Sequence, residues 1–200
     1  MASKFTDTTA IMQVIGCVFK NPQILDITDK YSIVDEDFPD TFHKTVFGAI
    51  YKIHELGANR INLQQIEDFL NSRPKAAATF KVNKGEEWIL KVSDTCTASA
   101  FDYYYNRLKK FTLLRAYDNC GIDVSDIYDP DNIMDVKKKQ LQEDILDNST
   151  LEQIADKIDE KINSMVKQRY NKEAKNMTKA EYDNVVDGLE KIIKKNEVGA

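Results

Sequence analysis

Glycine and proline are scarce in this sequence, which has seven Gly and four Pro among its 200 residues. Their scarcity favours helices over a turn-rich β fold, because tight turns draw heavily on both residues. Long apolar runs are also missing, since no stretch approaches the roughly 18 residues of a membrane span. The start, MASKFTDTT, lacks the apolar core of a signal peptide. We therefore expect a helical, cytoplasmic protein with no membrane segment.

Residues that bind metals or act as nucleophiles are few. Cys17, Cys96 and Cys120 are odd in number and lack the paired spacing of metal ligands, so we expect reduced and mostly buried thiols. His43 and His54 lie eleven residues apart on one predicted helix, with no third ligand in evidence. A packing or capping role is therefore favoured for both histidines over a metal-binding or catalytic role.

A loop for binding nucleotide phosphates is also missing. None of the seven Gly is followed by a second Gly five residues later and then by Lys and Ser or Thr. The acidic run Asp35, Glu36 and Asp37 is interpreted as negative charge at the start of a helix, rather than as a general acid and base. We expect no catalytic residue, metal or cofactor in this chain.

The charge balance argues against DNA binding by this chain alone. The net charge is −5, whereas non-specific DNA affinity comes mostly from neutralising phosphates with Lys and Arg. The basic run at 137–139 lies in an acidic neighbourhood and is interpreted as a solvated surface. Tyr103, Tyr104 and Tyr105 are of a type that stacks on bases. However, three successive helical positions cannot share a face, so we expect two in the core and one at the surface.

What the sequence does contain is helical periodicity, most clearly between residues 35 and 63. Pro39 is predicted in the first turn of a central helix, where a residue needs no amide hydrogen. Gly57 is expected to end this helix in the left-handed conformation, and Asn62 with Gln65 offers a cap for the next one. Between these points apolar residues recur at the spacing of one buried helical face; they are Phe42, Val46, Ile50 and Ile53, widened by Phe47 and Leu56.

Two helices are predicted before the central one. The first covers about residues 8–20, with Asp7 as its cap, and Asn21-Pro22 starts a short second helix. Gly16 and Cys17 are small residues in the middle of the first helix, where they suit close contact with another helix. Its apolar face consists of Ile11, Val14, Ile15, Val18 and Phe19.

The helices after the central one follow the same rules. A short helix is expected to end at Arg73-Pro74, then a loop, then a helix that follows Gly85 and holds Trp88 in the core. Residues 98–128 are predicted as one long helix that ends at Asp129-Pro130. Its buried side consists of Phe101, Tyr104, Tyr105, Leu108, Phe111 and Leu114.

An apolar seam follows an extra segment at residues 131–149, which is predicted to be helical around 136–146. The seam occupies residues 151–166 at the four-and-three spacing of a coiled coil about two heptads long. It could pair with the second half of the long helix, and it could equally be a subunit interface. The predicted self-association residues are Leu151, Ile154, Ile158, Ile162 and Met165, with Ala155 also in the seam.

A second stripe lies near the carboxyl end. Residues 171–177 are polar and are interpreted as a linker, and Thr178 with Glu181 forms a capping box for a last helix. We expect this helix to dock in a groove, on its own domain or on a second copy of the chain. The predicted docking residues are Tyr182, Val186, Leu189 and Ile193, in a stripe that also holds Val185 and Ile192.

Several motifs occur in a characteristic order. They are Ile15-Gly16, Asn21-Pro22, Asp37-Phe38, His43 three residues before Val46-Phe47, Gly57, Ile61-Asn62-Leu63, Trp88 with Leu90, and Tyr104 with Leu108 and Arg115. This order resembles the amino-terminal domain of DnaB-like replicative DNA helicases. The resemblance covers about residues 8–128 well and 150–170 moderately, and the parent protein could be encoded by a phage.

The resemblance implies an all-α fold with three parts. Residues 1–114 would form a compact helical bundle of about five to six helices, and residues 115–170 a helical hairpin that carries the extra segment at 131–149. Residues 171–200 would form a linker and a separate linker helix. The resemblance itself also favours a subunit interface as the role of the 151–166 seam.

The resemblance also implies scaffolding rather than catalysis. Such domains form homo-oligomers in the collar of a hexameric ring and dock primase or a helicase loader during DNA replication. ATP and Mg²⁺ would bind only to a carboxy-terminal ATPase domain, and DNA would be held only by the full-length ring. The alternative is a free-standing helical adaptor or inhibitor that binds a replicative helicase. A phosphate loop encoded beyond residue 200 would favour the first hypothesis, and a stop codon the second.

The missing phosphate loop makes a testable prediction. Because no backbone cradle for phosphates is present, calorimetry should detect no micromolar, Mg²⁺-dependent binding of ATP by this chain, and a phosphate-release assay should detect no hydrolysis. Tight nucleotide binding would contradict the interpretation of the chain as the amino-terminal part of a helicase.

Overall fold

The computed structural model describes residues 4–132 and 134–176, and every regular element within these ranges is helical. The predicted all-α fold is confirmed. The chain divides into two compact units, the first ending at Ile154 and the second beginning at Ala155. In the described ranges, no helix is long and apolar enough to cross a membrane. The predicted domain boundaries at residues 114 and 170 stay a prediction.

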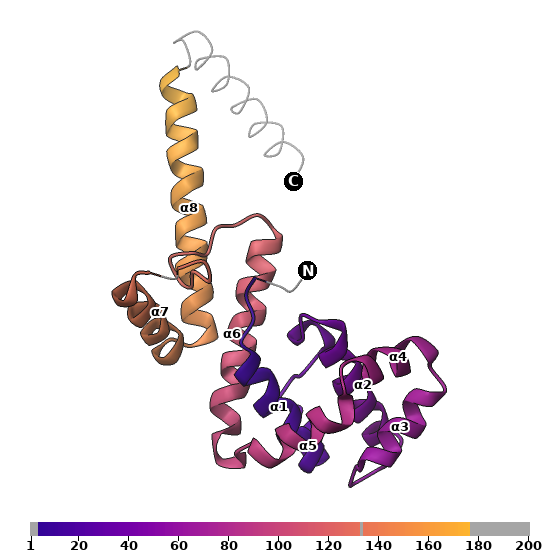
Figure 1. Ribbon diagram of the computed structural model, residues 1–200. Helices are drawn as coiled ribbons and strands as arrows, with labels where there is room; N and C mark the ends of the chain where they lie inside the picture. The colour runs from indigo at the N-terminus through magenta and orange to yellow at the C-terminus, as the bar shows by residue number, and fades with distance from the viewer. Residues whose placement is uncertain (1–3, 133, 177–200) are drawn as a thin grey trace, which may run out of the picture. The chain divides into compact units, whose positions relative to one another are not determined.

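Helix α1 (Thr8–Lys20) lies at the centre of the first unit. The Asp7 carboxylate caps it as predicted, accepting a hydrogen bond from the Ala10 amide at 2.8 Å. Helices α5 (Gly85–Thr95) and α6 (Phe101–Asn119) pack against α1 (Figure 1). A Cβ atom at Gly16 would lie only 2.5 Å from the Val92 carbonyl oxygen of α5. Gly16 is therefore the residue that lets the two helices approach, as its small size predicts.

The central helix begins later than predicted. Two 3₁₀ turns, η1 (Pro22–Asp26) and η2 (Asp35–Asp37), precede α2 (Thr41–Glu55). Asp40 caps α2 by accepting a hydrogen bond from the His43 amide at 2.8 Å, so Pro39 lies before the cap and not in the first turn. Leu56 is 80% exposed and does not widen the buried face, because the helix has ended at the preceding residue. Gly57 has a φ of 99° and confirms the predicted stop.

One helix forms where a loop was expected. Helix α3 (Leu63–Asn71) has the predicted capping box of Asn62 and Gln65. Helix α4 (Pro74–Val82) then begins directly at Pro74. The proline that ends α3 also suits the first turn of a new helix, where its missing amide hydrogen costs nothing. Phe80 is buried and fixes α4 to the core of the unit.

Helix α6 ends nine residues before the predicted end at residue 128. Its buried side is nearly as predicted, and Tyr105 is buried whereas Tyr103 is 46% exposed. The helix stops at Asn119 because Gly121 adopts a φ of 77°, which turns the chain away from the helix axis. The apolar residues Val124 and Ile127 follow the helix. They are buried, but they lie in a loop and not in a longer helix.

The extra segment forms helix α7 (Val136–Asn148) and packs on α6 within the first unit. The Arg107 guanidinium of α6 contacts Glu143 at 2.7 Å and Asp147 at 3.1 Å, and it also contacts the α1 cap, Asp7. Lys110 of α6 donates a hydrogen bond to a backbone carbonyl near the end of α7. Polar contacts thus attach α7 to α6, since α7 itself buries only Gln142 and Leu146.

Helix α8 (Leu151–Asn176) runs across the boundary between the two units. It continues through residues 171–176, where a linker was predicted. The predicted linker helix, with its docking residues Tyr182, Val186, Leu189 and Ile193, lies outside the described residues.

A buried carboxylate fixes η2 to α6. Asp37 is fully buried, and its oxygens accept hydrogen bonds from the Lys109 ammonium (2.9 and 3.0 Å), the Thr112 hydroxyl (2.8 Å) and the Val34 amide (2.9 Å). Asp37 does lie in the first turn of a helical element, η2, where its bond to the Val34 amide is part of the cap, but its buried contacts with Lys109 and Thr112 were not predicted. The partners that decide its role lie more than seventy residues away, where sequence spacing gives no signal. Asp35 and Glu36, by contrast, are exposed at the surface.

Replacing Asp37 tests this cluster. Asp37→Ala should lower the free energy of unfolding by about 3–5 kcal/mol, because it leaves a partly buried ammonium without its counter-charge. Asp102→Ala is the matched control: its carboxylate also pairs with a lysine, Lys30, but both side chains are more than half exposed. The control should leave stability nearly unchanged. Equal effects of the two substitutions in urea unfolding would show that burial does not set the strength of the Asp37 cluster.

Candidate functional site

The predicted self-association seam on α8 is buried at one end and open at the other. Ile154 and Ile158 are 0% and 2% exposed, whereas Met165 is 60% exposed. Leu151 and Ile162 are partly buried. In a single chain, the first two turns of the seam are therefore already covered and the later turns are available for contact.

Two further residues extend the open part of this seam. Val166 and Tyr170 are 60% and 68% exposed, and both follow Ile162 at intervals of four residues, which places them on one side of the helix. We call Ile162, Met165, Val166 and Tyr170 the α8 stripe. The predicted seam ended at residue 166 and did not name Val166 among its self-association residues. It also stopped before Tyr170, although the four-residue spacing continues to that residue.

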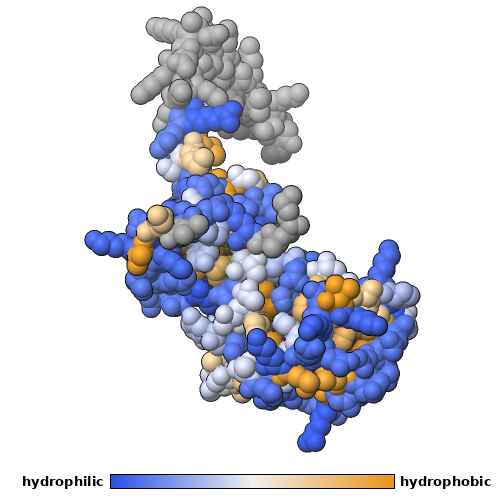
Figure 2. Space-filling model, viewed as in Figure 1, coloured by the Kyte–Doolittle hydropathy of each residue, from blue (hydrophilic) through white to orange (hydrophobic). Residues whose placement is uncertain are grey.

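A groove runs over the outer side of α2 in the first unit. On the side of the molecule that Figure 2 shows, hydrophobic residues are interspersed among mostly hydrophilic ones over the helical bundle. The groove encloses about 670 Å³, and a smaller hollow of about 210 Å³ continues it past Ile33, Val34 and Tyr51. Its floor includes the buried residues Phe47 and Leu70. We call this continuous surface the α2 groove.

Charged residues line the edges of the α2 groove. Asp35 and Glu36 of η2 form one edge, and the cations come from α2 and from the turn between α3 and α4. These cations are Lys44, Lys52 and Arg73. No single sequence signal indicates this surface, because residues 33–36, 44–52 and 69–76 come together only in the folded chain.

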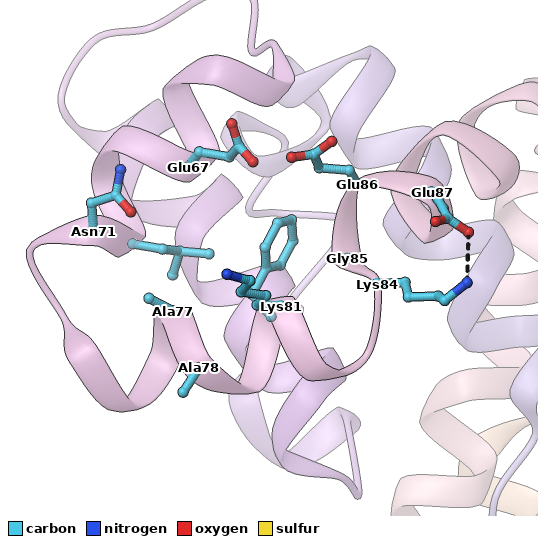
Figure 3. Close-up of a pocket in the computed structure, with 11 residues that line it drawn as sticks. Glu67, Asn71, Ala77, Ala78, Lys81, Lys84, Gly85, Glu86 and Glu87 are labelled. Atoms are coloured by element: carbon cyan, nitrogen blue, oxygen red, sulfur yellow. Dashed lines mark hydrogen bonds and ion pairs between the residues drawn. The ribbon is translucent and has the colours of Figure 1, made fainter.

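A second hollow, of about 610 Å³, lies beside α3, α4 and the start of α5. The carboxylates of Glu67 and Glu86, which line this hollow, face each other at close range (Figure 3). The hydrogen bond with Glu86 raises the pKa of Glu67. In the part of the chain that the structure describes, no group of three His, Cys, Asp or Glu residues is placed to hold a metal ion.

The two histidines have different surroundings. His43 is 8% exposed, contacts the Asp40 carboxylate and packs on Trp88, with ring centroids 5.1 Å apart. Burial lowers the pKa of His43, and Asp40 opposes this shift. His54 lies 2.8 Å from the carboxylate of Asp26, and this hydrogen bond raises its pKa.

The three thiols are all free. Cys17 is buried, and its burial together with the neighbouring Cys96 raises its pKa to about 12. Cys96 is partly buried, and Cys120, directly after the end of α6, is exposed, so of the three thiols predicted to be mostly buried only Cys17 is fully so. A thiol with so high a pKa is a poor nucleophile at neutral pH.

Comparison with known proteins identifies the family. Residues 5–110 match the family described as DnaB-like helicase N terminal domain. The chain belongs to this family. The match spans α1 to α5 and the first half of α6, and it includes the α2 groove. The DnaB-like domain is a non-catalytic part of helicases, and the predicted resemblance is confirmed.

One curated relative of this DnaB-like domain comes from a prophage. It is the SPbeta prophage-derived uncharacterized protein YorI of Bacillus subtilis (strain 168), which is 36% identical over 148 residues. The aligned region covers 74% of the present chain and 29% of YorI. The present chain therefore matches less than a third of this relative, whose prophage origin agrees with the predicted phage connection. No solved structure matches the domain.

The two histidines should give the stability of the DnaB-like domain opposite pH dependences. His54, with its pKa raised above the ordinary 6.5, stabilises the fold below pH 6.5, and this contribution is lost as the pH rises through its folded-state pKa. The pKa of His43 is lowered from 6.5, so this histidine costs the fold no stability above pH 6.5. As the pH falls from 6.5 towards its folded-state pKa, the free energy of unfolding decreases.

Urea unfolding between pH 5 and 8 separates the two effects. His54→Gln should remove the loss of stability on the alkaline side, and His43→Gln should remove the loss on the acidic side. Each variant serves as the control for the other. If both substitutions changed the pH dependence of the free energy of unfolding in the same way, the opposite roles assigned to His43 and His54 would be contradicted.

Proposed function

We propose that this domain is the amino-terminal scaffold of a hexameric replicative DNA helicase, acting in the cytoplasm during DNA replication. In this role it assembles the subunits of the ring collar and docks primase or a helicase loader. Membership of the DnaB-like family supports the helicase role. The exposed α8 stripe supports the assembly role and is the observation that carries it.

The α8 stripe has the properties of a helix–helix interface. Met165, Val166 and Tyr170 are each at least 60% exposed in the single chain. Full burial of an aliphatic side chain contributes roughly 1.5–3 kcal/mol, so covering the stripe favours association. Two copies of one helix can cover each other by a two-fold contact, because both present the same residues. The proposed unit of assembly is thus a homodimer, and three such dimers would complete the ring.

Nucleotide chemistry belongs elsewhere in the proposed helicase. The region aligned with this chain is 29% of the length of YorI, which leaves room in a protein of that length for a further domain. We propose that ATP and Mg²⁺ bind to such a carboxy-terminal domain, and that DNA is held by the full-length ring rather than by this acidic domain.

Charges placed on the α8 stripe test the assembly role. Met165→Asp with Tyr170→Asp should convert a dimer or larger oligomer into a 22.9 kDa monomer, because two carboxylates cannot be buried without partners. Light scattering measures the mass, and circular dichroism checks that helicity is kept. Ile158 is left unchanged, since it is already buried in the single chain and Asp there would disturb folding.

The matched control carries the same two charges on another surface. Leu56→Asp with Val82→Asp alters residues that are 80% and 82% exposed, and it should leave the mass unchanged. An unchanged mass in the stripe variant, or a wild-type chain that is monomeric at all concentrations, would show that α8 is no interface.

A further inference from the structure

Two of the three thiols meet where α1 packs on α5. Cys17 lies within α1 and is 3% exposed, and Cys96 is the residue directly after α5. Gly16 brings these helices together, since a Cβ atom there would lie 2.9 Å from the Cβ atom of Cys96. Both cysteines line one hollow of about 350 Å³. The fold therefore brings together, at one hollow, two thiols that are far apart in sequence.

The two thiols differ in access and in freedom to move. Cys17 is held inside a helix, and besides its burial, the charge of Cys96 and a hydrogen bond with it raise the pKa of the Cys17 thiol. Cys96 is partly buried, and its backbone is extended rather than helical, with φ −72° and ψ 144°. Its Sγ atom donates a hydrogen bond to the Ser93 carbonyl oxygen at 3.2 Å. Because a thiol is a weak donor, rotation of the Cys96 side chain from Ser93 towards Cys17 gives up little.

Positive charge lies beside the thiol of Cys96. The Lys20 ammonium donates a hydrogen bond to the same Ser93 carbonyl oxygen at 2.9 Å, so the amine and the thiol converge on one atom. Lys20 also lines the hollow, whereas the carboxylate that lines it, Asp102, pairs with Lys30 at 2.8 Å. The ammonium attracts anionic reagents to the thiols. Oxidised glutathione, a small disulfide that carries carboxylates, is a reagent of this kind.

We propose that Cys17 and Cys96 form a reversible redox site, at which a small anionic disulfide such as oxidised glutathione produces an intramolecular disulfide bond. The site goes beyond the proposed helicase scaffold and does not depend on it. Cys96 is the entry thiol because it is the more accessible of the two. Cys17 is the resolving thiol, since it faces Cys96 from within α1.

The reaction consists of two exchange steps. The Cys96 thiolate attacks one sulfur of oxidised glutathione, its S–S bond breaks, and one glutathione leaves and takes up a proton. With Cys96 in a mixed disulfide, its negative charge no longer raises the pKa of Cys17. Cys17 loses its proton to solvent and attacks the Cys96 sulfur, and the second glutathione leaves and is protonated. Two electrons thus pass from the two protein thiols to the oxidant, which is reduced to two thiols.

Exchange with glutathione on the native full-length chain tests this proposal. The chain is equilibrated with mixtures of oxidised and reduced glutathione, quenched with acid, digested and analysed by mass spectrometry. The peptides of Cys17 and Cys96 should be joined, and dithiothreitol should separate them. Cys120, which is exposed at the end of α6, should instead carry a mixed disulfide with glutathione. A chain in which Cys96 keeps its glutathione while Cys17 stays reduced would overturn the proposal, as would a chain in which neither thiol reacts.

Two single substitutions separate the roles of the thiols. In Cys17→Ala, Cys96 should retain the glutathione that the wild-type chain loses in the second step. In Cys96→Ser, the buried Cys17 should stay reduced, because no accessible thiol accepts the first exchange. Circular dichroism checks that both variants keep their helicity. Glutathione on Cys17 in the Cys96→Ser variant, formed as fast as on Cys96 in the wild-type chain, would overturn the assignment of Cys96 as the entry thiol.

A thermodynamic cycle supplies a measurement on the unsubstituted chain. The bond would close a loop that contains α2, α3 and α4, so it should lower the ratio of unfolded to folded chains in urea by roughly a hundredfold. The equilibrium constant for forming the bond from oxidised glutathione should be larger in the native chain than in the urea-unfolded chain by the same factor, because the two effects are linked. A native constant no larger than the unfolded one would show that the fold does not bring the thiols together, and it would overturn the proposal.

Discussion

The buried carboxylate of Asp37 is the interaction on which the arrangement of the first unit depends. A buried carboxylate is stable only when its oxygens are fully supplied with donors, and here a lysine, a threonine and a backbone amide supply them. The neighbouring Arg115 donates to the carbonyl oxygens of Phe5, Glu36 and Asp37 itself. Together these bonds fix η2 and the amino-terminal residues to α6, and η2 in turn forms one edge of the α2 groove.

Helix α6 carries a second polar cluster that works in the same way. Arg107 joins the cap of α1 to two carboxylates of α7, and Lys110 reaches a carbonyl of α7 from a buried position. Burial lowers the pKa of Lys110 and of Arg115, which shows how far these cations are removed from water. α6 is therefore packed on its apolar side and on parts of its charged side, and its charged residues contact α7 beside the buried Leu146 of that helix.

The two candidate surfaces lie on separate units and have different chemistry. The α8 stripe is apolar and can cover a copy of itself, whereas the α2 groove combines an apolar floor with edges that carry acidic and basic side chains. A contact of the first kind closes in pairs. Neither surface needs a reactive side chain, which is in keeping with a non-catalytic domain of a helicase.

The sequence by itself determined what is decided within one or two helical turns. The cap at Asp7, the capping box of Asn62 and Gln65, the stop at Gly57 and the buried faces of α1 and α2 were all predictable, because the interacting groups lie three or four residues apart. The family was also predictable, since its motifs occur in order along the chain. The early end of α6, the helix at Pro74 and the exposure of Leu56 were missed where two local signals competed. Only the tertiary structure decided the role of Asp37 and the existence of the α2 groove. Both depend on segments distant in sequence, and neither hydrophobic periodicity nor charge spacing records which distant side chains meet once the apolar faces have packed.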